Sequence, residues 1–175
     1  NCFRFGADNH LCLNSATITQ ILGPNGLGKS SIPLIIEEAL FNKNSKGVKK
    51  ASIPNRINDD GYWINLLFYK DKDDYEVDIS RKAMIKVRLF KNGEDISSHT
   101  ATGTFKTIEG IIGHDFKTFS QIVYQNTSKS LQFLTATDTN RKKFLIDLLH
   151  LEEYVKHFET FKVAAKQVQV AVTQY

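Results

Sequence analysis

The 175-residue sequence contains only two cysteines and three prolines, and it has no long hydrophobic segment. Cys2 and Cys12 have no partner pair and no metal-ligand spacing, so they indicate reduced, packed thiols rather than a disulfide scaffold or a zinc site. Because no apolar run is long enough to span a bilayer and no signal peptide is recognisable, we expect a cytoplasmic (intracellular) protein without a membrane partner. The small net charge of +4 is compatible with a nucleic-acid partner but does not indicate one.

The composition, with 41% hydrophobic and 24% charged residues, is that of an ordinary globular protein. A chain of this length forms one domain, or one domain with an appendage, and buries a sizeable core. It begins at Asn1, close to strand-like sequence, and we expect a few further residues to precede it.

Residues 23–31 read Gly-Pro-Asn-Gly-Leu-Gly-Lys-Ser-Ser, the pattern G-x-x-x-x-G-K-S of a phosphate-binding loop. A β-branched apolar run at 17–22 precedes it and a helix-like segment follows, which is the context that the motif requires. Glycines let successive N–H groups point at phosphate oxygens, and the positive end of the next helix adds to the attraction. Lys29 would reach the β- and γ-phosphates, and Ser30 would ligate Mg²⁺. The alternative is a chance glycine-rich turn, but the flanks favour a nucleoside triphosphate site.

Short strands are expected ahead of the loop, at 2–5 and 11–13, leading into a strand over 17–22. The apolar residues of 32–41 predict a largely buried helix. Pro33 is tolerated in its first turns because few backbone donors have intrahelical partners there.

Alternating apolar and polar residues predict three strands, over 63–69, 75–81 and 84–90. Asn92-Gly93 is a strong hairpin signal after the third strand. A short helix and turn over 110–119 are expected to lead into a strand over 121–125.

Lys82, Lys86 and Arg88 are expected on one face of a strand over 82–90, with apolar side chains on the other face. Such a face could contact DNA phosphates in a salt-sensitive, sequence-independent way. The alternative is a solvated sheet face, which patterns of this kind form more often.

The C-terminal part of the chain is predicted to be helical, with Thr137 or Thr139 capping one helix. Apolar residues then recur at alternating intervals of four and three, at Tyr154, Phe158, Phe161, Ala165, Val168 and Val172. This heptad spacing is typical of a coiled coil, although an amphipathic helix packed on its own domain is the alternative. Because the pattern still runs at Tyr175, we expect the coiled coil to continue.

A phosphate-binding loop, a β-rich segment and an outgoing coiled-coil helix follow one another along the chain. In this combination the sequence resembles the N-terminal lobe of the SMC-like ABC ATPases, specifically the SbcC type that works in DNA double-strand break repair and recombination. The layout is most similar to phage-encoded members, for which the location would be the host cytoplasm. Further segments that carry the resemblance are 1–6, 32–41, 47–53, 122–125 and 140–154.

The resemblance implies an α/β fold, the N-terminal half of a P-loop ABC-type ATPase head over 1–150, with a β-rich subdomain. An antiparallel coiled coil would begin over 151–175. The positions that match the ATP-binding Walker A residues are Asn25, Gly26, Gly28, Lys29, Ser30 and Ser31. Gln125 matches the Q-loop glutamine, which touches Mg²⁺ and the attacking water, so Lys29 and Gln125 would act in catalysis. Arg4 stands one position later than the arginine of the family's opening motif and is a further candidate for binding the nucleotide.

The general base and the signature loop of such ATPases are absent from the sequence, since 66–71 and 144–147 imitate a Walker B strand only superficially. The resemblance places both elements on a C-terminal lobe that returns after the coiled coil. The chain alone should therefore bind ATP weakly and hydrolyse it negligibly. Completed by its own C-terminal lobe and by a second copy of the head, an ATP-dependent homodimer would gate an SbcD-like Mn²⁺-dependent nuclease on double-stranded DNA.

Two other functions remain open at this point. One is an SMC or other recombination ATPase that tethers DNA without a nuclease, and the other is a small nucleotide-switched module that binds a helical partner through the tail. A metabolite kinase would need an acceptor pocket and lid arginines, which the sequence does not show.

Overall fold

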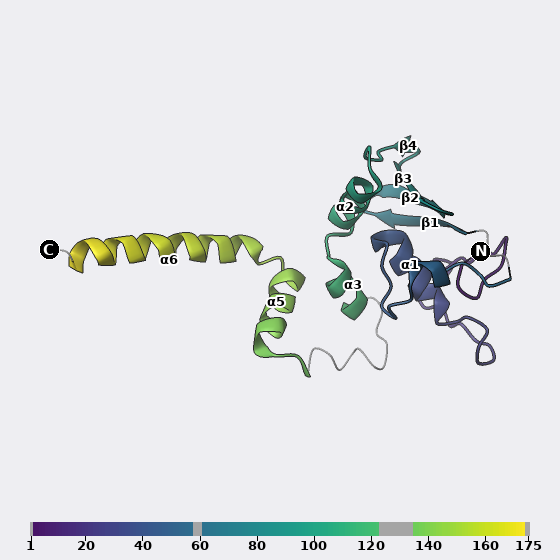
Figure 1. Cartoon of the computed structure of the whole chain (residues 1–175), viewed down its shortest axis with the longest axis horizontal. Coiled ribbons are helices and arrows are strands. Elements are labelled where there is room, and N and C mark those ends of the chain that lie inside the picture. Colours follow the sequence, from purple (N-terminus) through teal and green to yellow (C-terminus); the bar gives the residue numbers. More distant parts are fainter. Residues whose placement is uncertain (1, 58–60, 123–134, 174–175) are drawn as a thin grey trace. The chain divides into compact units, whose positions relative to one another are not determined.

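The computed structural model describes residues 2–57, 61–122 and 135–173. The chain divides into two units, Asn1–Phe116 and Lys117–Tyr175. The elements of the first unit are α1 (Ser31–Phe41), the 3-10 helix η1 (Lys50–Ser52), β1 (Tyr62–Lys70), β2 (Asp73–Arg81), β3 (Ile85–Lys91), β4 (Glu94–Asp95) and α2 (Ala101–Ile112) (Figure 1). Those that follow are α3 (Phe116–Ile122), α5 (Asp138–Leu148) and α6 (Glu152–Thr173).

The four strands form one antiparallel sheet in the order β1-β2-β3-β4, so neighbours in sequence are neighbours in space (Figure 1). Asn92 and Gly93 form the turn between β3 and β4, with φ values of 51° and 84°. This left-handed geometry is the one that an Asn-Gly dipeptide favours in a two-residue hairpin. The three predicted strands and the Asn-Gly hairpin are therefore confirmed, except that the third strand begins at Ile85.

One face of the sheet is covered by two helices. α1 packs against β1 and β2, and α2 packs against β3 and α1. The centre of this layer contains fully buried aliphatic side chains, namely Val77, Ile79, Leu89 and Ile108. Buried and exposed positions alternate along the strands because successive side chains of a strand point to opposite faces. The resulting core lies directly beneath α1, the helix that follows the predicted phosphate-binding loop.

The segment 17–22, expected as a strand before the loop, has no regular secondary structure. Ile18 and Leu22 are 86% and 78% exposed. A strand is stabilised by hydrogen bonds and side-chain contacts from its neighbours, and no described residue forms a β-bridge with this segment. Residues 2–5 form only isolated bridges and 11–13 form none, so the expected strands ahead of the loop are wrong for this chain.

The helix expected over 110–119 begins earlier and spans Ala101–Ile112. Thr100 is its N-cap, and the Thr100 hydroxyl accepts a hydrogen bond from a backbone N–H of the first turn at 3.1 Å. At the other end Lys70 of β1 donates to carbonyl oxygens of the last turn, and Gly113 follows in the left-handed conformation with φ of 84°. Both ends of α2 are therefore set by side chains that the apolar pattern of the helix does not include.

In the second unit, Gln121 and Ile122 belong to α3, so the strand expected over 121–125 is wrong at its start, and 123–125 lie outside the described residues. α5 begins after Thr137, one of the two predicted caps, although the Thr137 hydroxyl makes no capping hydrogen bond. Within this unit Thr118 of α3 donates a hydrogen bond to Asp147 of α5.

α6 confirms the helix predicted for the tail. None of its described residues is buried, and its exposed large hydrophobic side chains include Tyr154, Phe158, Phe161, Val168 and Val172. An apolar stripe of this kind is stable in water only when another surface covers it. None of the helices in the described part of the chain is both long and apolar enough to cross a membrane.

The two cysteines should differ in reactivity. Cys2 is 3% exposed and burial raises its pKa to about 12, whereas Cys12 is exposed. Because the thiolate is the reactive form, iodoacetamide at pH 8 should alkylate Cys12 in the native protein and modify Cys2 only after unfolding in urea. Peptide mass spectrometry measures both sites, and a Cys12→Ser variant should show no native labelling. Equal labelling of both thiols in the native protein would contradict the burial of Cys2.

Candidate functional site

The predicted phosphate-binding loop leads directly into α1. Residues 23–30 form irregular turns, and the helix begins at Ser31. Gly26 and Gly28 have φ values of 86° and 93°, a backbone conformation that residues with a Cβ rarely adopt. A hydrogen bond of 2.8 Å from the Ser31 N–H to the Gly28 carbonyl closes the last turn of the loop. The curvature of the loop therefore depends on glycine at these two positions.

The side chain of Lys29 folds back over its own loop. Its Nζ donates to the Gly23 carbonyl at 2.6 Å and to the Pro24 carbonyl at 2.8 Å. Two carbonyl oxygens thus hold a half-buried positive charge against the loop backbone. A phosphate would offer this amine a charged acceptor, which forms a stronger hydrogen bond than a neutral carbonyl does.

The backbone donors around Lys29 have no internal partners. Over the ranges that the structure describes, the N–H groups of residues 25–30 make no hydrogen bond. Ser30 is the N-cap of α1, but its side chain makes no capping bond, and the first turn contains no acidic residue. Pro33, in the same turn, has no N–H that would need a partner. The Ser31 and Ile32 N–H groups of the first turn bond back to the Gly28 and Lys29 carbonyls, so the donors that keep no partner are those of the loop. They lie beside the partial positive charge at the N-terminus of α1, an arrangement that attracts anions.

This donor set fits a nucleotide phosphate with a divalent cation. The ammonium of Lys29 and the loop N–H groups supply positive charge, and the exposed Ser30 hydroxyl supplies an oxygen of the kind that Mg²⁺ prefers. Asn25 and Gly26 are also exposed, whereas Gly28 and Ser31 are buried and support the loop from within. In the described part of the chain no three His, Cys, Asp or Glu side chains gather into a metal site.

Arg4 lies against the loop. A Cβ atom added to Gly28 would lie 2.8 Å from the Cβ of Arg4 and 3.7 Å from Cε2 of Phe5. The base of the Arg4 side chain therefore packs directly on the loop backbone, while the residue as a whole is exposed. The structure thus brings Arg4 beside the glycine-rich loop that the sequence predicted as its site of action.

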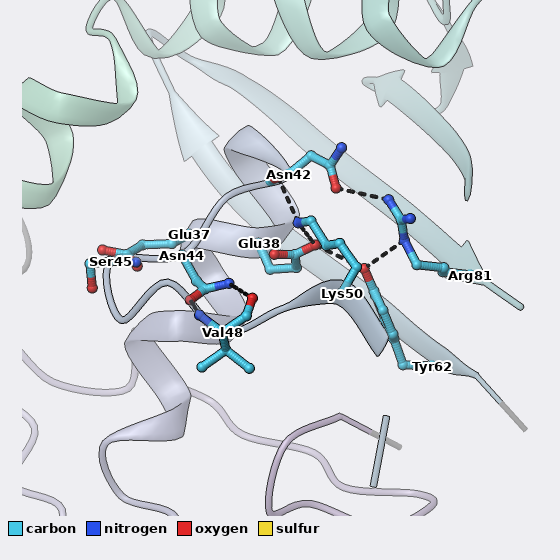
Figure 2. Close-up of polar contacts among 9 residues, drawn as sticks. All are labelled: Glu37, Glu38, Asn42, Asn44, Ser45, Val48, Lys50, Tyr62 and Arg81. Atoms are coloured by element: carbon cyan, nitrogen blue, oxygen red, sulfur yellow. Dashed lines mark hydrogen bonds and ion pairs between the residues drawn. The ribbon is translucent and has the colours of Figure 1, made fainter. Parts of the chain in front are cut away.

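A buried carboxylate lies at the other end of α1. Glu38 Oε1 accepts hydrogen bonds from Lys50 of η1 and from the Tyr62 hydroxyl of β1, the latter at 2.8 Å (Figure 2). Arg81 of β2 donates to the Tyr62 hydroxyl oxygen at 3.1 Å and to the Asn42 side-chain oxygen at 3.0 Å. Lys50 also donates to the backbone carbonyl of Asn42, the C-cap of α1, at 2.6 Å. We call these five residues the Glu38 cluster; it joins α1 to η1 and to two strands.

Burial and the charge of Glu38 set the protonation of its partners. Desolvation lowers the pKa of Lys50, and the hydrogen bond to Glu38 opposes this effect. Burial raises the pKa of Tyr62 well above its ordinary value, and the charge of Glu38 raises it further. Tyr62 therefore stays protonated at physiological pH and remains a hydrogen-bond donor to Glu38.

Other predicted residues are not brought to this site. Gln125 lies outside the described residues, so its role stays a prediction. Lys86 and Arg88 are exposed on the outer face of β3. Lys82 precedes this strand, so the prediction that all three residues lie on one strand face is wrong for Lys82. Asp78 of β2 lies directly opposite Arg88, and a neighbouring carboxylate weakens a surface that would bind phosphates.

Sequence reasoning missed the Glu38 cluster. Glu37 and Glu38 interrupt the apolar residues of a helix predicted to be largely buried. Because buried carboxylates are almost always paired, this interruption could have predicted a cationic or hydroxyl partner for at least one of them. No local pattern could have named Lys50 and Tyr62, which come from two separate segments.

The chain matches the family described as an AAA domain over residues 2–171. It is 44% identical over 173 residues to "Probable exonuclease subunit 2" of Escherichia phage T5, which covers 96% of this chain and 28% of that protein. It is 28% identical over 140 residues to "Exonuclease subunit 2" of Enterobacteria phage T4, covering 79% of this chain and 25% of the relative. It is also 27% identical over 156 residues to "DNA double-strand break repair Rad50 ATPase" of Methanococcus maripaludis, covering 89% of this chain and 16% of that protein.

The chain therefore spans between 16% and 28% of the length of these three relatives. The matches confirm the resemblance predicted from the motifs, to the N-terminal ATPase lobe of the SbcC type and to phage-encoded members in particular.

Replacement of Gly28 by alanine should destabilise the protein by about 2–4 kcal/mol, since the left-handed backbone costs about 1–2 kcal/mol and the clash with Arg4 adds an overpacking cost. Gly47→Ala is the matched control, because Gly47 also has a positive φ, of 65°, but no atom lies within 4 Å of its added Cβ. Urea denaturation measures both changes. Equal losses for the two variants would contradict the close approach of Arg4 to the loop.

Replacement of Tyr62 by phenylalanine should lower the free energy of unfolding by about 1–2 kcal/mol, because it leaves a buried oxygen of Glu38 with one donor fewer. Tyr69→Phe is the matched control, since Tyr69 is exposed on the same strand, and should change stability by less than about 0.5 kcal/mol. Thermal or urea denaturation distinguishes the two variants. A neutral Tyr62→Phe would show that the Tyr62 hydroxyl does not stabilise the buried carboxylate of Glu38.

Proposed function

The chain belongs to the AAA domain family, and we propose that it binds ATP with Mg²⁺ as the N-terminal half of an ATPase head of the SbcC type. The observation that carries the proposal is the combination of Lys29, held over the loop, with the N–H groups of residues 25–30, which make no hydrogen bond among the described residues, at the positive end of α1. These N–H groups and the lysine ammonium together form the kind of cationic donor set that binds phosphate oxygens.

In the proposed complex each part of the loop has its own role. Lys29 exchanges the Gly23 and Pro24 carbonyls for the β- and γ-phosphates, and the loop N–H groups bind phosphate oxygens. Asn25, Gly26, Gly28 and Ser31 would form the rest of the cradle. Ser30 would hold Mg²⁺, which supplies charge neutralisation when it is bound.

Two residues outside the loop complete the site in this proposal. Arg4 would add a positive charge beside the phosphates, which its position against Gly28 supports. Gln125 would touch Mg²⁺ and the attacking water, as the family resemblance implies.

We assign hydrolysis to the complete head rather than to this chain. The sequence contains no general base for the attacking water, so a C-terminal lobe of the same protein would supply it and would face a second copy of the head. The exposed apolar side chains of 17–22 support such a lobe, because added strands would cover them. On this proposal the N-terminal lobe spans 1–150, and a coiled coil begins over 151–175, where the exposed stripe of α6 would pair with the returning helix.

The names of the relatives favour a nuclease complex. Two of the three are exonuclease subunits and one is a DNA double-strand break repair ATPase. We therefore propose that the head works in the cytoplasm, in DNA repair and recombination, and gates an SbcD-like Mn²⁺-dependent nuclease on double-stranded DNA. These names favour the nuclease complex over DNA tethering alone. Lys86 and Arg88 would give DNA phosphate contacts, weakened by Asp78 beside them.

The decisive substitution is Lys29→Ala in the polypeptide that carries this chain. It should weaken ATP binding about ten- to a hundredfold, because it removes charge-assisted hydrogen bonds to two phosphates. It should also abolish ATP-dependent dimerisation of the head without loss of helix content. Titration with a fluorescent ATP analogue, light scattering and circular dichroism measure the three effects. Lys46→Ala, in an exposed loop position, is the control. Unchanged ATP affinity in Lys29→Ala would refute the assignment of the loop.

A further inference from the structure

The N-terminal residues form a tight bend with Arg4 near its tip. Two hydrogen bonds of 3.0 Å join the backbones of Cys2 and Phe5, one in each direction. Phe3 has a φ of 53°, in the left-handed region, which costs a residue other than glycine of order 1–2 kcal/mol. A bend that contains such a residue persists only where other contacts hold it.

Those contacts come from the segment that follows η1. The Phe3 N–H donates to the Ile53 carbonyl at 2.6 Å, and Cys2 forms an isolated bridge with Pro54. Asn55 adds a side-chain contact to this junction, since its Nδ2 donates to the Phe5 carbonyl at 3.2 Å. The segment 50–55 thus holds the bend in place through backbone and side-chain contacts.

The side chain of Asn55 is fixed at both of its polar atoms. While Nδ2 bonds to Phe5, Oδ1 accepts a hydrogen bond from the Ile57 N–H at 3.0 Å. At the start of the same segment, Lys50 is bound to Glu38 and to the C-cap carbonyl of Asn42. The segment is therefore anchored to the C-terminal end of α1 and reaches back to the bend that packs on the loop at its N-terminal end.

The tip of the bend faces the loop through Arg4. The Cβ of Arg4 is so close to Gly28 that no side chain fits between them. Arg4 is exposed, and over the described ranges its guanidinium has no hydrogen bond or ion pair. A planar guanidinium binds phosphate oxygens through two parallel hydrogen bonds, but only when its base is held in place.

We propose that Asn55 is a positioning residue for nucleotide binding, because it holds the Phe5 carbonyl and thereby the bend that places Arg4 beside the phosphate-binding loop. The inference rests on the proposed ATP site. Without the Asn55 contact the strained bend relaxes, and the Arg4 side chain is no longer held beside the loop. Asn55 itself touches no ligand, so its whole effect on ATP affinity passes through Arg4.

A double-mutant cycle tests this dependence. In the polypeptide that carries this chain, Arg4→Ala should raise the Kd for a fluorescent ATP analogue about tenfold, and Asn55→Ala about fivefold. The double variant should bind no more weakly than Arg4→Ala alone. Asn55→Asp, which keeps the acceptor for Ile57 but places a carboxylate against the Phe5 carbonyl, should behave as Asn55→Ala does.

Asn44→Ala is the matched control. The Asn44 side chain also bonds to backbone, donating to the Val48 carbonyl at 3.0 Å and accepting from the Val48 N–H at 2.7 Å, but it does not touch the bend (Figure 2). It should lose stability to urea about as Asn55→Ala does, yet bind the analogue with unchanged affinity.

Three outcomes would overturn the inference: unchanged affinity in Asn55→Ala, unchanged affinity in Arg4→Ala, or a double variant in which the two losses multiply. Lys29→Ala, measured alongside, separates this failure from that of the proposed function. If the wild type binds the analogue and Lys29→Ala does not, but the Asn55 effect is absent, then only the positioning role is wrong. If the wild type does not bind it at all, both proposals fall.

Discussion

The position of α1 depends on a carboxylate that water does not reach. A buried charge is strongly destabilising unless it is paired, so the side chain of Glu38 requires Lys50 and Tyr62 beside it. These partners belong to η1 and β1, and the pairing therefore fixes the C-terminal end of α1 against the sheet. The predicted phosphate-binding loop leads directly into the N-terminus of the same helix, so this contact also helps to fix the position of the loop.

The two ends of α1 differ in how their polar groups are satisfied. At the C-terminal end, the cap residue Asn42 accepts hydrogen bonds on both its backbone and its side-chain oxygen. At the N-terminal end, the cap residue Ser30 makes no capping bond, and the loop N–H groups before it have no internal partner. Folding thus satisfies the cap residue at one end and leaves loop donors and positive charge at the other. The second end is therefore suited to an anionic ligand.

Two exposed apolar segments, 17–22 and the stripe of α6, have the composition of surfaces that another part of a protein covers. The segment 17–22 has the composition of a strand, and the heptad stripe of α6 has that of a coiled coil, yet both expose large apolar side chains. On the proposed function, a C-terminal lobe and a returning helix would cover these two surfaces. The stripe formed as predicted because a helix makes its own backbone hydrogen bonds. The strand did not, because a strand needs a neighbour to supply them.

The sequence by itself determined the features that rest on local chemistry. Two-residue periodicity and Asn92-Gly93 specified the hairpins, the glycines and Lys29 specified the loop, and heptad spacing specified the tail helix. It did not reveal the start of α2, whose cap at Thr100 precedes any clear apolar pattern. Only the tertiary structure decided which distant residues meet: Glu38 with Tyr62, Arg4 with Gly28, and Asn55 with Phe5, 50 residues away. Such contacts follow from the packing of helices on a sheet, and the periodicity of a single segment carries no information about them.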